Sequence, residues 1–111
     1  MRSLPPAMMF IHGGGFRGGS KLSAAPAGYT RYFAERGFVG FSIDYRVLGD
    51  YGTLPDTINA ALDANTELSH DDREQAKAIY PAVRDAKAAL RWIVANADQY
   101  GIDTDHITIA G

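Results

Sequence analysis

Residues 7–16 read AMMFIHGGGF, and this stretch decides how the rest of the chain is interpreted. Its first five residues are apolar, and a continuous apolar run of this length that ends in glycines is typical of a strand buried on both faces of a parallel sheet. The three glycines allow backbone conformations that a Cβ atom would forbid, and they leave peptide N–H groups uncovered. We therefore expect a buried strand over residues 7–11, followed by a loop whose donors can hold a negatively charged oxygen.

Helix and strand patterns alternate beyond this loop. Tyr29, Tyr32 and Phe33 recur at helical spacing ahead of Gly37, which predicts an amphipathic helix of about three turns. Residues 38–43 form a second apolar run and residues 107–110 a third. Strands joined by helical crossovers imply parallel pairing. The expected fold class is α/β, with three parallel strands and crossover helices on both faces.

The connection between the second and third strands is long. Residues 49–56 are rich in turn residues, and Ile58 with Ala61 and Leu62 indicates a short helix after them. Another helix is expected over residues 73–80, which Pro81 should break or restart. From Pro81 a helix that Gly101 closes should place Trp92 in the core and line one face with Val83, Ala86, Leu90, Ile93, Val94 and Ala97.

Composition narrows the class of protein. The 111 residues suit one domain, which we expect to be truncated, and 46% apolar with 22% charged residues are ordinary globular proportions. A net charge of -2 without a basic stripe makes nucleic acid an unexpected partner. The absence of cysteine excludes disulfides and thiolate metal sites. No run approaches about eighteen apolar residues, so no membrane span is expected. No signal peptide is recognisable either.

The glycines admit a second interpretation. Gly13, Gly15 and Gly18 match the spacing of a dinucleotide-binding fingerprint, and Asp44 ends the next strand, where an acid could bind a ribose. That fingerprint requires its last glycine to open a helix directly, whereas residues 19–26 read as continued loop. A Rossmann-type dinucleotide-binding module therefore stays as an alternative.

Several separated motifs together resemble the α/β-hydrolase superfamily, and more narrowly its carboxylesterase and lipase members with an HGGG-type loop. They are HGGGF at 12–16, DYR at 44–46, YPAVRDAKAALRWI at 80–93, YGID at 100–103 and ITIAG at 107–111. The resemblance covers nearly the whole chain. Residues 48–79 align with no shared motif, so we expect a subfamily insertion there.

The resemblance implies a function and a site. The N–H groups of Gly13 and Gly14, with Gly15 as a further contributor, would line an oxyanion hole that His12 shapes through hydrogen bonds. The strands would lie in the order second, first, third. Such enzymes hydrolyse small carboxylic esters through a serine acyl-enzyme, and no metal or organic cofactor is implied.

The catalytic triad of this fold runs in the order serine, acid, histidine. Gly111 would be the first glycine of the G-x-S-x-G nucleophile elbow, so none of the triad is expected within this chain, which by itself should be inactive. A non-catalytic binding domain of the same fold is a further alternative.

The remaining polar candidates have ordinary structural interpretations. Ser20 should be a loop serine, because no strand precedes it. His70 and His106 are expected at the surface, and the spacing of the histidines makes a metal site improbable. Asp44 and Asp85 lie near arginines and should form ion pairs.

Overall fold

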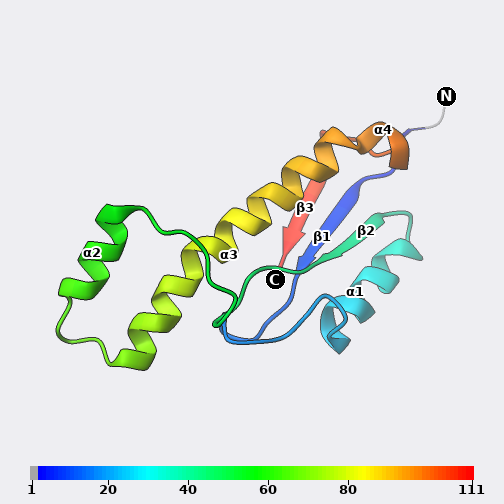
Figure 1. Ribbon diagram of the computed structural model, residues 1–111. Coiled ribbons are helices and arrows are strands. Elements are labelled where there is room, and N and C mark those ends of the chain that lie inside the picture. Colours follow the sequence, from blue (N-terminus) through cyan, green and yellow to red (C-terminus); the bar gives the residue numbers. More distant parts are fainter. Residues whose placement is uncertain (1–2) are drawn as a thin grey trace.

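The computed structural model describes residues 3–111 and forms one parallel sheet with helices on either side (Figure 1). The strands lie in the order β2-β1-β3, and both neighbouring pairs are parallel. The α/β fold class and the strand order are therefore confirmed. Along the chain the elements are β1 (Ala7–Ile11), α1 (Ala24–Ala34), β2 (Val39–Ile43), α2 (Asp56–Ala64), α3 (His70–Ala95), α4 (Ala97–Tyr100) and β3 (Ile107–Ala110).

The central strand β1 is covered on both faces because its side chains alternate between two helices. Met9 is 1% exposed and belongs to the same buried cluster as Ile93 of α3. The next side chain, Phe10, points the other way and stacks on Tyr29 of α1, with ring centroids 5.7 Å apart. This two-sided burial explains why the strand reads as a continuous apolar run.

The start of α1 bears on the dinucleotide interpretation. The helix begins at Ala24, and residues 19–23 between it and the last fingerprint glycine, Gly18, are loop and turn. Pro26 lies in the first turn of α1, where its missing N–H costs nothing. No helix opens at Gly18, so the geometry that a dinucleotide fingerprint requires is not present.

The long helix α3 differs from expectation, because it runs through Pro81 without a break. Pro81 is buried, and a Cβ added at Gly52 would lie 2.6 Å from its ring carbons. A proline within a helix removes one hydrogen bond. Here the ring packs closely against the loop at Gly52, and the helix continues through the position.

The buried face of α3 is also narrower than expected. Its buried residues are Pro81, Ala82 and Ile93, whereas Val83, Val94 and Trp92 each expose nearly half their surface. Val83 and Val94 follow Ala82 and Ile93 by one residue, which rotates them about 100° out of the core-facing line. The prediction of a core position for Trp92 was therefore wrong. Its ring instead meets Phe41 edge-on and tilts against Tyr100 at the rim of the sheet.

The single helix predicted from Pro81 to Gly101 is two helices in the structure. The helix α3 ends at Ala95, and the short α4 carries Ala97. Gly101, with φ of 65°, closes α4 and not the long helix.

Helix α2 and the first half of α3 form an antiparallel hairpin that extends beyond the carboxyl edge of the sheet (Figure 1). Arg73 binds the carbonyl oxygens at the end of α2 and in the following turn, at 2.9–3.2 Å. Lys77 and Asp63 form an ion pair across the two helices at 2.7 Å. Within residues 3–111, none of the helices combines the length and the apolar character needed to cross a membrane.

Candidate functional site

The glycine loop, residues 12–19, leaves the sheet at the carboxyl end of its central strand β1. Ligands of open α/β sheets bind at this edge, where neighbouring strands deliver their loops side by side. A cavity of about 340 Å³ lies here, and its lining combines part of the loop with residues of β1, α3 and the segments that follow β2 and β3: Ile11, His12, Gly13, Gly15, Phe16, Tyr45, Ala82, Val83, Ala86 and Gly111. Most of its lining is apolar, and its polar groups come from the loop backbone, His12 and Tyr45.

The carbonyl groups at the start of the loop are all engaged by the protein itself. The hydroxyl of Tyr45 donates to the carbonyl oxygen of His12 at 2.6 Å. The His12 ring in turn binds the carbonyl of Gly13 through Nδ1 at 2.8 Å, and since a carbonyl can only accept, Nδ1 carries the proton. The carbonyl of Gly14 accepts from the N–H of Arg17 at 3.0 Å.

The next two carbonyls are held by residues far along the chain. The side-chain amide of Gln75, on α3, donates from Nε2 to the carbonyl oxygen of Gly15 at 2.5 Å. The carbonyl of Phe16 accepts from the N–H of Leu48 at 2.7 Å. Five consecutive carbonyls, from residue 12 to residue 16, therefore have donors within the protein.

The N–H groups of the three consecutive glycines in this loop are not engaged in the same way. Among residues 3–111, no hydrogen bond is donated by the N–H of Gly13, Gly14 or Gly15. A trans peptide directs its N–H opposite to its C=O, so fixing each carbonyl also fixes the direction of the following N–H. The loop thus presents prearranged backbone donors, the kind of group that binds a negatively charged oxygen.

The three consecutive loop glycines differ in whether their conformation and packing require glycine. Gly14 and Gly15 have φ of 133° and 61°, and a Cβ at Gly14 would collide with the Gly18 carbonyl. Gly13 has neither feature: its φ is not positive, and a Cβ added there would have no atom within 4 Å. Phe16, with φ of 63°, adopts a left-handed conformation that costs a non-glycine residue on the order of 1–3 kcal/mol.

Tyr45 is a site residue that the sequence interpretation missed. It lies two residues beyond β2, is 9% exposed, and stacks on the buried His12 ring with centroids 4.1 Å apart. Burial raises the pKa of its hydroxyl above the ordinary value, which keeps it protonated and able to donate. Its position just past the carboxyl end of a neighbouring strand was the signal available in the sequence.

Asp44 and Asp85 form ion pairs, as expected. Asp85 on α3 accepts from the backbone N–H, Nε and Nη2 of Arg46 at 2.8–2.9 Å, and this guanidinium holds the pKa of Asp85 below its usual range. Asp44 pairs with a lysine and not with an arginine: it accepts from the N–H of Lys21 at 2.7 Å and lies 3.9 Å from its Nζ. Both contacts fix the chain where it leaves β2.

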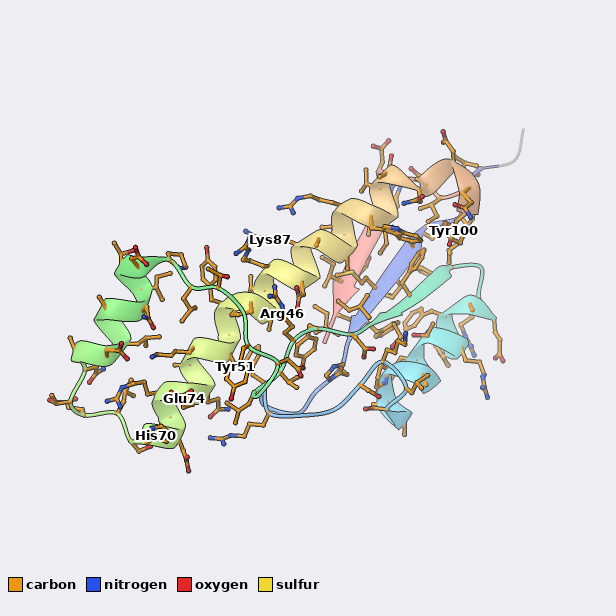
Figure 2. The ribbon with its side chains drawn as sticks, in the orientation of Figure 1. Arg46, Tyr51, His70, Glu74, Lys87 and Tyr100 are labelled. Carbon is orange, nitrogen blue, oxygen red and sulfur yellow. The ribbon has the colours of Figure 1, made fainter. Side chains whose placement is uncertain are left out.

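The serine and the other histidines lie away from the glycine-loop cavity. Ser20 immediately follows the glycine loop, and its hydroxyl accepts from the N–H of Leu22. His70 is exposed at the start of α3, at the end of the helix farthest from the sheet (Figure 2). His106 is exposed and binds Asp103 at 2.7 Å. In the described part of the chain, no three His, Cys, Asp or Glu side chains gather to hold a metal ion.

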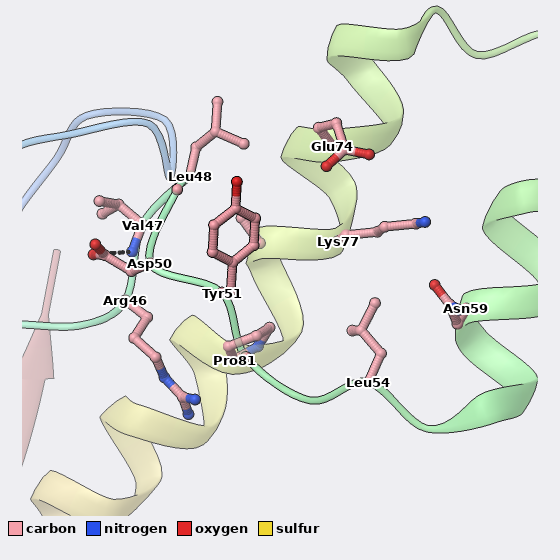
Figure 3. Close-up of a pocket in the computed structure, with 13 residues that line it drawn as sticks. Arg46, Val47, Leu48, Asp50, Tyr51, Leu54, Asn59, Glu74, Lys77 and Pro81 are labelled. Atoms are coloured by element: carbon pink, nitrogen blue, oxygen red, sulfur yellow. Dashed lines mark hydrogen bonds between the residues drawn. The ribbon is translucent and has the colours of Figure 1, made fainter.

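A second cavity, of about 280 Å³, lies between residues 46–54 and the helices α2 and α3 (Figure 3). Leu48 and Pro81 contribute apolar surface, and Tyr51 stands at its opening. Its two cationic side chains, Arg46 and Lys77, are both engaged by carboxylates. This cavity therefore offers no unpaired cation to an anionic ligand, and the glycine-loop cavity is the stronger candidate site.

The parallel sheet in the order β2-β1-β3, with helices on both faces, is that of a partial α/β-hydrolase fold. The family model BD-FAE matches residues 50–111, more than half of the chain, and the chain belongs to this family of hydrolases. The matched range includes residues 50–79, so most of the stretch without a recognisable motif lies inside the family match, and its origin as a subfamily insertion stays a prediction.

Esterases and lipases are among the similar proteins. Lipase 1 of Geotrichum candidum is 35% identical over 109 residues, covering 96% of this chain and 16% of that protein. Fumonisin B1 esterase of Sphingopyxis macrogoltabida is 30% identical over 106 residues, covering 96% and 17%. The solved structure of the esterase Est2 from Thermogutta terrifontis matches with a TM-score of 0.60 and 28% identity, over 96% of this chain and 29% of that one. The chain thus spans less than a third of each protein.

Proposed function

We propose that this chain supplies the oxyanion-hole loop of a serine hydrolase that acts on small carboxylic esters. The N–H groups of Gly13 and Gly14 would bind the ester carbonyl oxygen as it becomes negative, with the N–H of Gly15 as a further contributor. His12 shapes the loop from within, through its bond to the Gly13 carbonyl. Donors held in place before the reaction stabilise the transition state without a reorganisation cost.

One observation carries the proposal: Gly13 has no conformational or packing need to be glycine, and unlike Gly18 it lines the same cavity as Gly111, which follows β3. Its φ is ordinary and its Cβ would meet open space. What the missing Cβ does provide is unobstructed approach to the neighbouring N–H groups, which donate no hydrogen bond within residues 3–111. An approaching oxygen uses both features.

The rest of the machinery is proposed from the fold. The nucleophilic serine would follow β3 in the G-x-S-x-G elbow that Gly111 begins, with the acid and the histidine after it. The relatives that are named as esterases and a lipase support ester substrates. Residues 1–111 on their own are then expected to turn over no ester.

The test compares two alanine substitutions in the same loop, made in the complete natural polypeptide that contains residues 1–111. Gly13→Ala keeps the N–H of residue 13 but places a methyl group in the path of the oxygen. It should lower kcat/KM for p-nitrophenyl butyrate by about 100-fold, the size of effect expected when one oxyanion donor can no longer be reached. Gly18→Ala is the matched control, because its φ is also not positive and its Cβ also meets no atom within 4 Å. It should stay within about twofold of wild type.

Two results would count against the proposal. Equal, undiminished turnover by both variants would exclude an oxyanion role for the loop. A wild-type polypeptide that binds esters but turns none over would favour a non-catalytic binding domain of this fold.

A further inference from the structure

Gln75 links the helical hairpin to the glycine loop, although 60 residues separate it from Gly15. Its Nε2 donates to the Gly15 carbonyl, and its Oε1 accepts from Nη2 of Arg17 at 3.0 Å. Arginine can only donate and a carbonyl can only accept, so both partners fix the same orientation of the amide. One partly buried side chain therefore bridges two loop residues that flank Phe16.

Phe16 is the residue whose conformation most needs such support. Its φ of 63° lies in the left-handed region that side chains rarely adopt. The conformation of a residue is the relative rotation of the peptide planes on either side of it. The plane before Phe16 is held by Gln75 at the Gly15 carbonyl, and the plane after it by the N–H of Leu48 at the Phe16 carbonyl. Both restraints come from residues 48–79.

The glycine donors begin immediately before this restrained turn. The Gly15 carbonyl lies one peptide beyond the N–H of Gly15 and two beyond that of Gly14. Relaxation of Phe16 toward an ordinary negative φ would rotate the adjoining peptide and carry the donors with it. Small displacements of this kind have large effects on catalysis, because oxyanion donors act only at the correct distance and direction.

We propose that Gln75 is a positioning residue for ester hydrolysis, which holds the Gly15–Phe16 peptide so that the loop N–H groups stay directed at the reacting oxygen. This inference rests on the proposed function of the loop. It also gives a role to the hairpin: the first half of α3 lies beyond the carboxyl edge of the sheet (Figure 1), and Gln75 in this half reaches the Gly15 carbonyl.

Two substitutions in the complete natural polypeptide remove the hydrogen bond from Gln75 to the Gly15 carbonyl while keeping a side chain of similar length. Gln75→Glu keeps the length and the acceptor for Arg17 but presents an oxygen to the Gly15 carbonyl. Gln75→Met keeps the length and removes both hydrogen bonds. Lys77→Gln is the matched control. Lys77 lies on the same helix as Gln75, and the substitution breaks its ion pair with Asp63 of α2 but leaves the loop contacts in place.

The measurements are kcat and KM for p-nitrophenyl butyrate and the inhibition constant of an aryl trifluoromethyl ketone, which mimics the tetrahedral intermediate. Both Gln75 variants should lose at least about 10-fold in kcat with KM within about twofold, and ketone affinity should fall by the same factor as kcat. Lys77→Gln should stay within about twofold on all three. Amide hydrogen exchange over residues 13–18 should accelerate in Gln75→Met without a change across α3.

The outcomes distinguish this inference from the proposed function. If Gly13→Ala is impaired while both Gln75 variants keep wild-type kcat and ketone affinity, the positioning role is overturned and the oxyanion role stands. An equal loss in Lys77→Gln would also overturn it, because general loosening of the hairpin would then explain the effect. If the wild-type polypeptide hydrolyses no ester, both inferences fail together.

Discussion

Replacing Tyr45 with phenylalanine should destabilise the protein by about 1–3 kcal/mol. The hydroxyl donates to the His12 carbonyl at 2.6 Å, and that carbonyl has no other donor among residues 3–111. Phenylalanine keeps the ring and its stacking on His12, at 4.1 Å and 12° between planes. The loss is therefore confined to one hydrogen bond, and it leaves a buried acceptor unpaired, which sets the size of the effect.

The assay is urea unfolding of the complete polypeptide, with the free energy taken from the midpoint and slope. Tyr29→Phe is the matched control: its ring also stacks on a neighbour, but it is 57% exposed and its hydroxyl has no bond within residues 3–111. The control should lie within about 0.5 kcal/mol of wild type. If the free energy of unfolding of Tyr45→Phe is equally close to wild type, the Tyr45 hydroxyl does not stabilise the loop through the His12 carbonyl. Since Gly13 N–H shares a peptide with the His12 carbonyl, kcat should also fall about 10-fold.

Two further predictions use the same unfolding measurement. Gly40→Ala should lower the free energy of unfolding by about 1–3 kcal/mol, because its Cβ would lie 2.7 Å from Cγ2 of Thr30, where α1 packs on β2. Gly28→Ala, on α1, should raise the free energy of unfolding by about 0.5–1 kcal/mol, because its Cβ meets open space. Similar changes in both variants would contradict this packing. Asp85 should confer acid sensitivity: Arg46 lowers its folded pKa below the ordinary 3.8, so its contribution is present above that pH and lost as pH falls through the folded pKa. Asp85→Asn should thus lose less stability than wild type between about pH 5 and pH 2, and equal losses would show that the pair is not coupled to folding.

The strands could be predicted from the sequence because each is a short, largely apolar run, although of the three only β1 is buried on both faces. Residues 7–11 and 107–110 form strands with the predicted bounds, and the second strand begins at Val39, one residue later than predicted. The helices were harder where tertiary packing overrides local preference. Pro81 is a helix breaker by local rules, yet α3 continues through it, with the ring packed closely against Gly52.

The site was predictable only in part, for a related reason. The run of glycines predicts the loop. Tyr45 follows β2, and parallel strands bring their carboxyl ends, and so Tyr45 and the loop, to the same edge of the sheet. Gln75 carries no such signal. It is one polar residue in the polar first half of a helix, and only the path of the hairpin brings it to Gly15. Contacts between single side chains and distant carbonyls have no period or spacing for a sequence to display.

The directions of the loop donors are therefore not a property of the loop sequence alone. The carbonyls of residues 12, 15 and 16 are held by Tyr45, Gln75 and Leu48, which lie after β2, on α3 and in the connection between them. Each trans peptide converts a held carbonyl into a directed N–H one residue later. Gly14 and Gly15 make the required turn accessible, and the open side of Gly13 leaves the donors approachable. A change in residues 45–75 can thus alter the donors without touching a glycine, which is why variants at Tyr45 and Gln75 are the most informative on this account.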